Sequence, residues 1–137
     1  MKYILVILFT FYALSGSCQV FKYSSCCYRV IKRDKASKII QSKINLISPT
    51  IFIVDYANNT ILTHGDTAIS MRMTTIMENH KNEDGTNLQI FTALDKNQDK
   101  CAIFITHYNG NSKYGIDLLV DILYKEREIA FELRKFN

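Results

Sequence analysis

NLQIFTALDKNQDKCAIFITHY, residues 87–108, is the stretch that decides the fold class. Two apolar runs, residues 87–95 and 100–108, flank a short polar segment, as two strands flank a hairpin turn. The segment DKNQDK at 95–100 also spaces oxygen-bearing side chains like the start of a calcium loop. That loop needs a glycine at its sixth position and a glutamate at its twelfth, where this chain has Lys100 and Thr106. We therefore interpret the stretch as a β-hairpin.

Similar short apolar runs, separated by turn residues, extend over most of the chain. Turns are predicted at 56–59 (YANN), at 82–86 (NEDGT) with its Asp-Gly pair, and at 108–112 (YNGNS) with its Asn-Gly pair. The abundant Tyr and Phe residues suit strands. The pattern predicts an all-β fold, a single antiparallel sandwich or barrel-like meander of about seven to nine strands. The other early strands are expected at 20–32, 37–46, 50–56 and 59–64.

Two stretches fit both a strand and a helix. Residues 67–81 contain three methionines at a spacing that matches neither period, and we expect a strand that enters a longer connection, with one short helix as the alternative. Residues 114–136 have apolar side chains at helical spacing and also at every second position. Because the preceding chain is rich in strands, we predict a closing β-hairpin joined at YKERE, residues 124–128.

The first residues have the pattern of an export signal. Met1 and Lys2 precede an uncharged apolar run at 3–14, and small residues follow at 15–17. A short positive region, an apolar region of about 7–15 residues and a small-residue cleavage zone define a secretory signal peptide. The apolar run is short for a membrane span, which needs about 20 residues. We expect a signal peptide at 1–17, with cleavage before Cys18 or just after it, and a single β domain at 18–137.

LSGSC, residues 14–18, resembles a bacterial lipobox, in which a cysteine receives a lipid and becomes the first residue of the mature protein. We expect lipidation at Cys18 and membrane attachment through that anchor. Ser15 stands where the lipobox favours leucine, so simple cleavage after Cys18 is the alternative. The expected location is the periplasm or the outer membrane, with secretion as the alternative.

The net charge of the chain is +4, and it falls to +3 without Lys2. Basic and acidic residues alternate in segments such as YKEREIAFELRK, residues 124–135. This distribution indicates a solvated surface, and we expect no nucleic-acid partner.

Three cysteines remain in the mature chain. Because exported proteins mature where disulfides persist, we expect Cys101 to pair with Cys26 or Cys27, with three reduced thiols as the alternative. The adjacent pair has no spacer that would let both sulfurs bind one metal, and the histidines are isolated in sequence. We expect no metal site and no cofactor. Asp117 and Asp121 are interpreted as surface charges on a terminal strand.

Three segments, TIFIVDYANNTIL, IFTALDKNQDKCAIFI and YGIDLLVDILYKEREIAFELRK, resemble a group of small exported all-β proteins of unassigned function from Gram-negative bacteria. In that group a strand ending in Asp leads into an Asn/Asp/Lys turn, and a later hairpin carries Ala-x-Asp before a Cys. The resemblance implies an all-β domain and turn-forming roles for Asp55 and Asp95. It implies no catalytic residue.

We therefore expect an exported, lipid-anchored β domain that acts by binding an envelope protein or a small apolar ligand. The ligand would occupy a barrel cavity lined by Phe52, Phe91, Phe104 and Ile116. Two alternatives stay open at this point. One is a small thiol-dependent enzyme or hydrolase that uses Cys26 or Cys27 with a histidine. The other is a purely structural role in the cell envelope.

Overall fold

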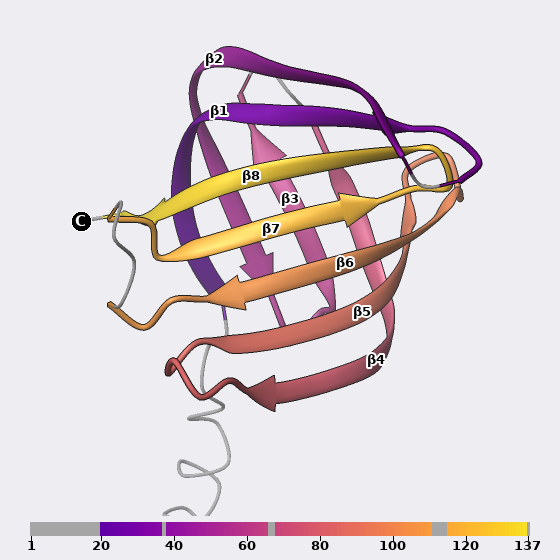
Figure 1. Cartoon of the computed structure of the whole chain (residues 1–137). Coiled ribbons are helices and arrows are strands. Elements are labelled where there is room, and N and C mark those ends of the chain that lie inside the picture. Colours follow the sequence, from indigo (N-terminus) through magenta and orange to yellow (C-terminus); the bar gives the residue numbers. More distant parts are fainter. Residues whose placement is uncertain (1–19, 37, 66–67, 111–114, 137) are drawn as a thin grey trace, which may run out of the picture.

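The computed structural model describes residues 20–36, 38–65, 68–110 and 115–136. Eight strands follow one another in chain order, each antiparallel to its neighbours, and β1 pairs with β8 to close a barrel (Figure 1). This confirms the predicted all-β class and, of the two architectures considered, the barrel-like meander. The strands are β1 (Val20–Arg33), β2 (Ile39–Asp55), β3 (Thr60–His64), β4 (Ser70–Lys81), β5 (Asn87–Asp95), β6 (Lys100–His107), β7 (Leu118–Leu123) and β8 (Arg127–Lys135).

The described segments contain strands where the sequence also allowed helices. β4 covers most of the methionine-rich stretch, so the short helix considered there is wrong. β7 and β8 form the predicted closing hairpin, joined by a hydrogen bond from the N–H of Tyr124 to the carbonyl of Arg127. Among the described residues, no helix is long and apolar enough to cross a membrane.

One predicted boundary is wrong. The sequence placed two strands at 37–46 and 50–56, but the structure has the single strand β2. The backbone runs through Pro49 at a register shift, where β1 skips from Ser25 opposite Thr50 to Cys27 opposite Leu46. Proline is tolerated at such a bulge because its missing N–H is not needed for the ladder. The strand therefore continues past a residue that normally ends one.

The interior of the barrel is filled by alternate side chains of each strand. β6 and β7 show the alternation most clearly, with every second residue buried. An eight-stranded barrel has an interior just wide enough for such side chains to fill. Phe131 lies at the centre, 5.3 Å from Phe52 and 5.6 Å from Tyr28 between ring centroids. The buried apolar residues are Tyr23, Phe52, Val54, Ile61, Met71, Met73, Phe91, Ala93, Cys101, Ile103, Ile105, Leu118, Val120, Ile122, Phe131 and Leu133.

The two ends of the barrel are built from different turns. At the Tyr56 end lie the start of β1, the β2–β3 and β4–β5 turns and the β6–β7 connection. At the Tyr124 end lie the β1–β2, β3–β4, β5–β6 and β7–β8 connections. Asp55 accepts hydrogen bonds from Asn58 in the first set, and Asp95 accepts them from the N–H groups of Asn97 and Asp99 in the second. Both aspartates therefore form turns, as expected.

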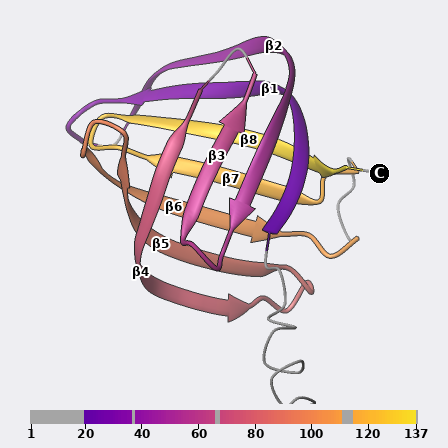
Figure 2. The ribbon, with the colours of Figure 1, turned by 180° about the vertical axis from the view of Figure 1, so that it is seen from behind.

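Two hairpins extend past the short strand β3, in opposite directions (Figures 1 and 2). β2 pairs with β3 only through Ile51–Asp55, and β4 pairs with β3 only near its own start. Within the described part of the chain, residues 39–45 of β2 and 75–81 of β4 therefore pair with a strand on one side only. We call the β1–β2 turn with the strand residues on both sides of it the β1–β2 tip (residues 29–43). The end of β4 with the turn that follows it is the β4–β5 tip (residues 75–86).

Candidate functional site

A hollow of about 480 Å³ lies at the Tyr56 end, between the barrel and the β4–β5 tip. Its volume falls in the range of about 300–1,000 Å³ that is usual for small-molecule sites. The lining combines aromatic rings with several carboxamides. The lining residues are Phe21, Tyr56, Asn59, Ile76, Asn79, Asn87, Gln89, Phe91, His107 and Asn109. We call this hollow the mouth site.

Three polar side chains form a closed hydrogen-bonded group within the mouth site. The Tyr56 hydroxyl donates to Gln89 Oε1 at 2.9 Å. His107 Nε2 lies 3.1 Å from the same Gln89 oxygen and 3.3 Å from the Tyr56 hydroxyl. Three elements supply these groups: the turn after β2, the first half of β5 and the last residue of β6. An antiparallel meander brings these three points to one end of the barrel because alternate strand ends meet there.

Two phenylalanines hold the Tyr56 ring in place. Phe21 meets it edge-on, with ring centroids 6.0 Å apart and an interplanar angle of 74°. Phe91 lies on the barrel side, with centroids 6.4 Å apart. Edge-on and tilted arrangements are the ones that aromatic pairs favour. The hydroxyl of Tyr56 is thus aimed by packing as well as by its hydrogen bond.

The mouth site carries no formal charge at neutral pH. Its described lining contains no Asp, Glu, Lys or Arg. Burial, and to a smaller extent the positive charge of Lys135, lower the pKa of His107, so the imidazole is neutral. Burial also raises the pKa of Tyr56, so the phenol keeps its proton. Such a lining offers hydrogen bonds and aromatic faces without an ionic partner.

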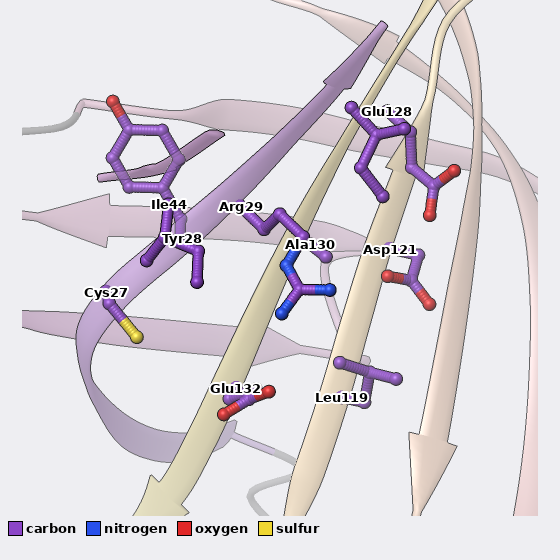
Figure 3. Close-up of a pocket in the computed structure, with 10 residues that line it drawn as sticks. Cys27, Tyr28, Arg29, Ile44, Leu119, Asp121, Glu128, Ala130 and Glu132 are labelled. Atoms are coloured by element: carbon purple, nitrogen blue, oxygen red, sulfur yellow. The ribbon is translucent and has the colours of Figure 1, made fainter. Parts of the chain in front are cut away.

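A second hollow, of about 420 Å³, lies on the outer face of the barrel over β1, β7 and β8 (Figure 3). The guanidinium of Arg29 lies over β8, with the carboxyl groups of Asp121 and Glu132 on either side of it. Partial burial, followed by the negative charge of Glu128, raises the pKa of Asp121 to about 6. Glu128 itself pairs with Arg33 at 2.9 Å. This hollow is therefore charged, in contrast to the mouth site.

The structure does not bring the four predicted ligand-binding residues into one hollow. Phe52 is fully buried in the core, and Phe91 is buried at the edge of the mouth site. Phe104 alternates with the buried Ile103 and Ile105, so it faces the outside of β6. Ile116 precedes β7 and is partly exposed. Of the four, Phe91 is the residue that lines the mouth site.

The structure does not show the predicted disulfide. Cys101 has a free thiol that lies 3.7 Å from the carbonyl of Ala93. It belongs to β6, whereas Cys27 belongs to β1, whose neighbours in the barrel are β2 and β8. The side chain of Cys26, like the predicted lipidation site Cys18 and the signal peptide at 1–17, lies outside what the structure describes.

The described cysteines and histidines are not arranged as a nucleophile and base. Burial and the nearby charge of Asp95 raise the pKa of Cys101 to about 11, so its reactive thiolate is scarce at neutral pH. Cys27 lines the outer hollow, whose described lining contains no histidine. His80 is exposed and lies 2.8 Å from Glu78. The described residues form no cluster of three or more potential metal ligands.

No family model, curated protein or solved structure matches the chain. The candidate site therefore depends on its own geometry. Sequence reasoning named neither Tyr56 nor Gln89, and it treated His107 as isolated. One signal was available: these polar residues stand where predicted strands meet turns, at positions that an antiparallel meander gathers at one end.

Proposed function

We propose that this protein is an exported β-barrel domain that binds a neutral, hydrogen-bonding small molecule in the mouth site. The observation that carries the proposal is the uncharged group formed by Tyr56, Gln89 and His107 beside the aromatic rings of Phe21 and Phe91. Export is supported by the signal-peptide pattern at 1–17, and attachment to a membrane by the lipobox-like LSGSC.

The chemistry of the lining favours one ligand class. Asn and Gln side chains each offer donors and acceptors, so several of them around one hollow suit a molecule with multiple hydroxyl or amide groups. The aromatic rings suit a flat apolar face on the same molecule. A charged ligand would lose hydration without gaining an ionic partner in the lining. We therefore favour a neutral polar ring compound over the purely apolar ligand expected from the sequence.

The packing of the barrel supports the same choice. The interior positions are occupied by large side chains such as Phe52, Ile61 and Phe131, all fully buried. A carrier of apolar molecules needs a cavity inside the barrel, whereas the mouth site lies at its end. Binding at the mouth needs no displacement of the core.

The proposal can be tested by titrating the purified chain with neutral pyranosides and nucleosides. Because the chain has no tryptophan, its eight tyrosines dominate the fluorescence, and the part of the change that is lost in Tyr56→Phe reports on Tyr56. We expect at least one such compound to change the fluorescence and to shift the amide resonances of Gln89 and His107. Gln89→Leu removes the shared acceptor and should weaken binding about tenfold, equivalent to about 1.4 kcal/mol.

Gln41→Leu, on the exposed part of β2, is the matched control and should leave binding unchanged. The proposal would fail if no neutral compound bound, if carboxylate or ammonium analogues bound as tightly, or if both glutamine variants bound like the wild type.

A further inference from the structure

The β1–β2 tip concentrates positive charge. Residues 29–43 contain six of the seventeen Lys and Arg residues and one of the thirteen Asp and Glu residues, which gives a net charge of +5. The whole chain has a net charge of +4, so the remainder is close to neutral at −1. In the sequence these residues look interspersed with apolar ones, but the hairpin gathers them at one end of the molecule. The basic residues are Arg29, Lys32, Arg33, Lys35, Lys38 and Lys43.

The tip and the residue that follows it expose three isoleucines. Ile39, Ile40 and Ile44 have 51%, 65% and 57% of their surface exposed. Their cross-strand partners are basic at two positions, because Ile44 is opposite Arg29 and Ile39 is opposite Arg33. Ile40 lies at a register irregularity, between the paired residues Ile39 and Gln41. The tip therefore presents apolar groups of β2, the strand with the free edge, beside cationic groups of β1.

The β4–β5 tip provides an internal comparison. Ile76 and Met77 are each 64% exposed, as much as the isoleucines of the other tip. Residues 75–86, however, contain three acidic residues and one lysine, for a net charge of −2. Exposed apolar surface alone is common on proteins and identifies no partner. Its combination with clustered cations is what distinguishes the β1–β2 tip.

We propose that the β1–β2 tip docks on an anionic lipid surface. The isoleucines enter the boundary between headgroups and acyl chains, and the four lysines of the tip, Lys32, Lys35, Lys38 and Lys43, contact the lipid phosphates. Arg33 is paired with Glu128, and Arg29 lies over β8 near two carboxyl groups. This is the division of labour by which amphipathic segments bind membranes, through buried apolar area together with attraction to anionic lipids. The net charge of +5 on the tip complements the negative charge of anionic lipids, and this is why we favour a lipid surface over a neutral partner. The proposal is independent of the ligand proposed for the mouth site.

The position of the tip fits this role. It lies at the Tyr124 end, whereas the mouth site lies at the Tyr56 end, so docking leaves the mouth open to solvent. β1 begins at the Tyr56 end, two residues after Cys18. A lipid on Cys18 would therefore tether the opposite end of the barrel, and the tip would contact a second surface. Where Cys18 carries no lipid, the tip is itself the contact with the membrane.

Co-sedimentation with lipid vesicles tests the proposal. Because an acyl chain on Cys18 and the apolar run at 3–14 would each bind lipid, every sample is the expected mature chain, residues 18–137, with Cys18→Ser; the whole barrel lies within it. We expect binding to vesicles that contain phosphatidylglycerol, at least tenfold weaker binding to pure phosphatidylcholine, and a marked loss at high salt because screening weakens the attraction. The double variant Lys32→Glu/Lys43→Glu should bind the anionic vesicles at least tenfold more weakly.

The isoleucines separate lipid docking from simple attraction to polyanions. Ile39→Ser/Ile40→Ser should also weaken vesicle binding about tenfold, and Ile76→Ser/Met77→Ser, the matched control at the other tip, should not. The six side chains substituted in the two tips are exposed, and circular dichroism verifies that each variant is folded. The proposal is overturned if Ile39→Ser/Ile40→Ser binds the anionic vesicles like the wild type. It is also overturned if Ile76→Ser/Met77→Ser weakens binding as much as Ile39→Ser/Ile40→Ser does, or if neutral vesicles bind as well as anionic ones. Retained binding of Ile39→Ser/Ile40→Ser, together with tight binding of free DNA or an acidic peptide, would identify a polyanion site instead.

Discussion

The β1–β2 and β4–β5 hairpins extend past the short strand β3 in the same way and at opposite ends of the barrel, but they have different surroundings. Both have a free strand edge, a register irregularity and large apolar side chains in solvent. One is strongly basic and stands over a charged hollow, and the other is mildly acidic and borders an uncharged one. The comparison teaches that backbone geometry sets where a surface can form, whereas the charges on it select what it binds.

The largest expected difference concerns the core beneath the two hairpins. Phe131 is fully buried between Phe52 and Tyr28, whereas Phe91 lies at the edge of the mouth site. Phe131→Ala should lower the free energy of unfolding by about 4 kcal/mol, because the cavity it leaves is closed on all sides. Phe91→Ala should cost less, about 3 kcal/mol, because its cavity opens into an existing hollow.

Urea unfolding measures both values. Phe136→Ala removes a ring that is 56% exposed and should change the free energy of unfolding by less than about 0.5 kcal/mol. An equal loss of unfolding free energy from Phe131→Ala and Phe91→Ala would show that the core is packed equally tightly around both rings. It would contradict the expected difference in packing between the two regions.

The charged hollow beside the β1–β2 tip should make stability depend on pH through Asp121. Its pKa is raised to about 6 in the folded state, so the folded protein binds this proton more tightly than the unfolded chain. The resulting stabilisation is complete below about pH 4 and is lost as the pH rises through 6. Asp121→Asn should therefore stabilise the protein by about 1 kcal/mol at pH 8, after allowance for solvent screening of this partly exposed carboxyl, and have little effect at pH 4.

Urea unfolding at a series of pH values checks this expectation, with Asp99→Asn at an exposed position as the control. A benefit from Asp121→Asn that was the same at pH 4 and pH 8 would contradict the assignment. It would mean that the pKa of Asp121 is the same in the folded and the unfolded state.

The smallest expected effects are changes in the free energy of unfolding from single substitutions in the two hairpin turns. Gly85, in the β4–β5 turn, has φ of +85°, a conformation that disfavours a side chain. Gly85→Ala should lower the free energy of unfolding by about 1 kcal/mol. In the β1–β2 turn, Ala36 donates its N–H to Asp34 at 2.9 Å, and Ala36→Gly should cost about 0.5 kcal/mol through the unfolded chain alone. Thermal unfolding compares the two variants. A larger loss of stability from Ala36→Gly would contradict the expectation that Gly85 is the conformationally more demanding position.

The sequence was sufficient to predict the fold class because strand alternation and turn residues are local signals. Residues 82–86, with their Asp-Gly pair, and residues 95–100, with their polar side chains, form the predicted turns. The continuity of β2 through Pro49 was not predictable in this way, since it depends on a bulge against β1 that only the tertiary pairing creates. In the ambiguous stretch at 114–136, a closing hairpin completes the barrel, whereas helical spacing was equally visible in the sequence.

The candidate site was harder to predict than the fold. A cavity inside the barrel was expected from large aromatic residues, but Phe104 faces outward and Phe52 fills the core. Tyr56, Gln89 and His107 meet because strand ends far apart in the chain share one end of the barrel. The separation of charge between the tips likewise follows from strand order, because a one-dimensional sequence does not show which residues gather at an end.

The shortness of β3 also has a dynamic consequence. Three residue pairs, from Thr60 opposite Arg72 to Leu62 opposite Ser70, join β3 to β4, far fewer than β4 makes with β5. Thr63 reinforces this seam, because its hydroxyl accepts the N–H of Ile69 at 2.7 Å and its own N–H donates to the Ile69 carbonyl. Cooperative units with few hydrogen bonds have the lowest local unfolding free energies. The barrel should therefore open first between β3 and β4, and amide hydrogen exchange should be faster for the amides that join these two strands than for those that join any other two neighbouring strands.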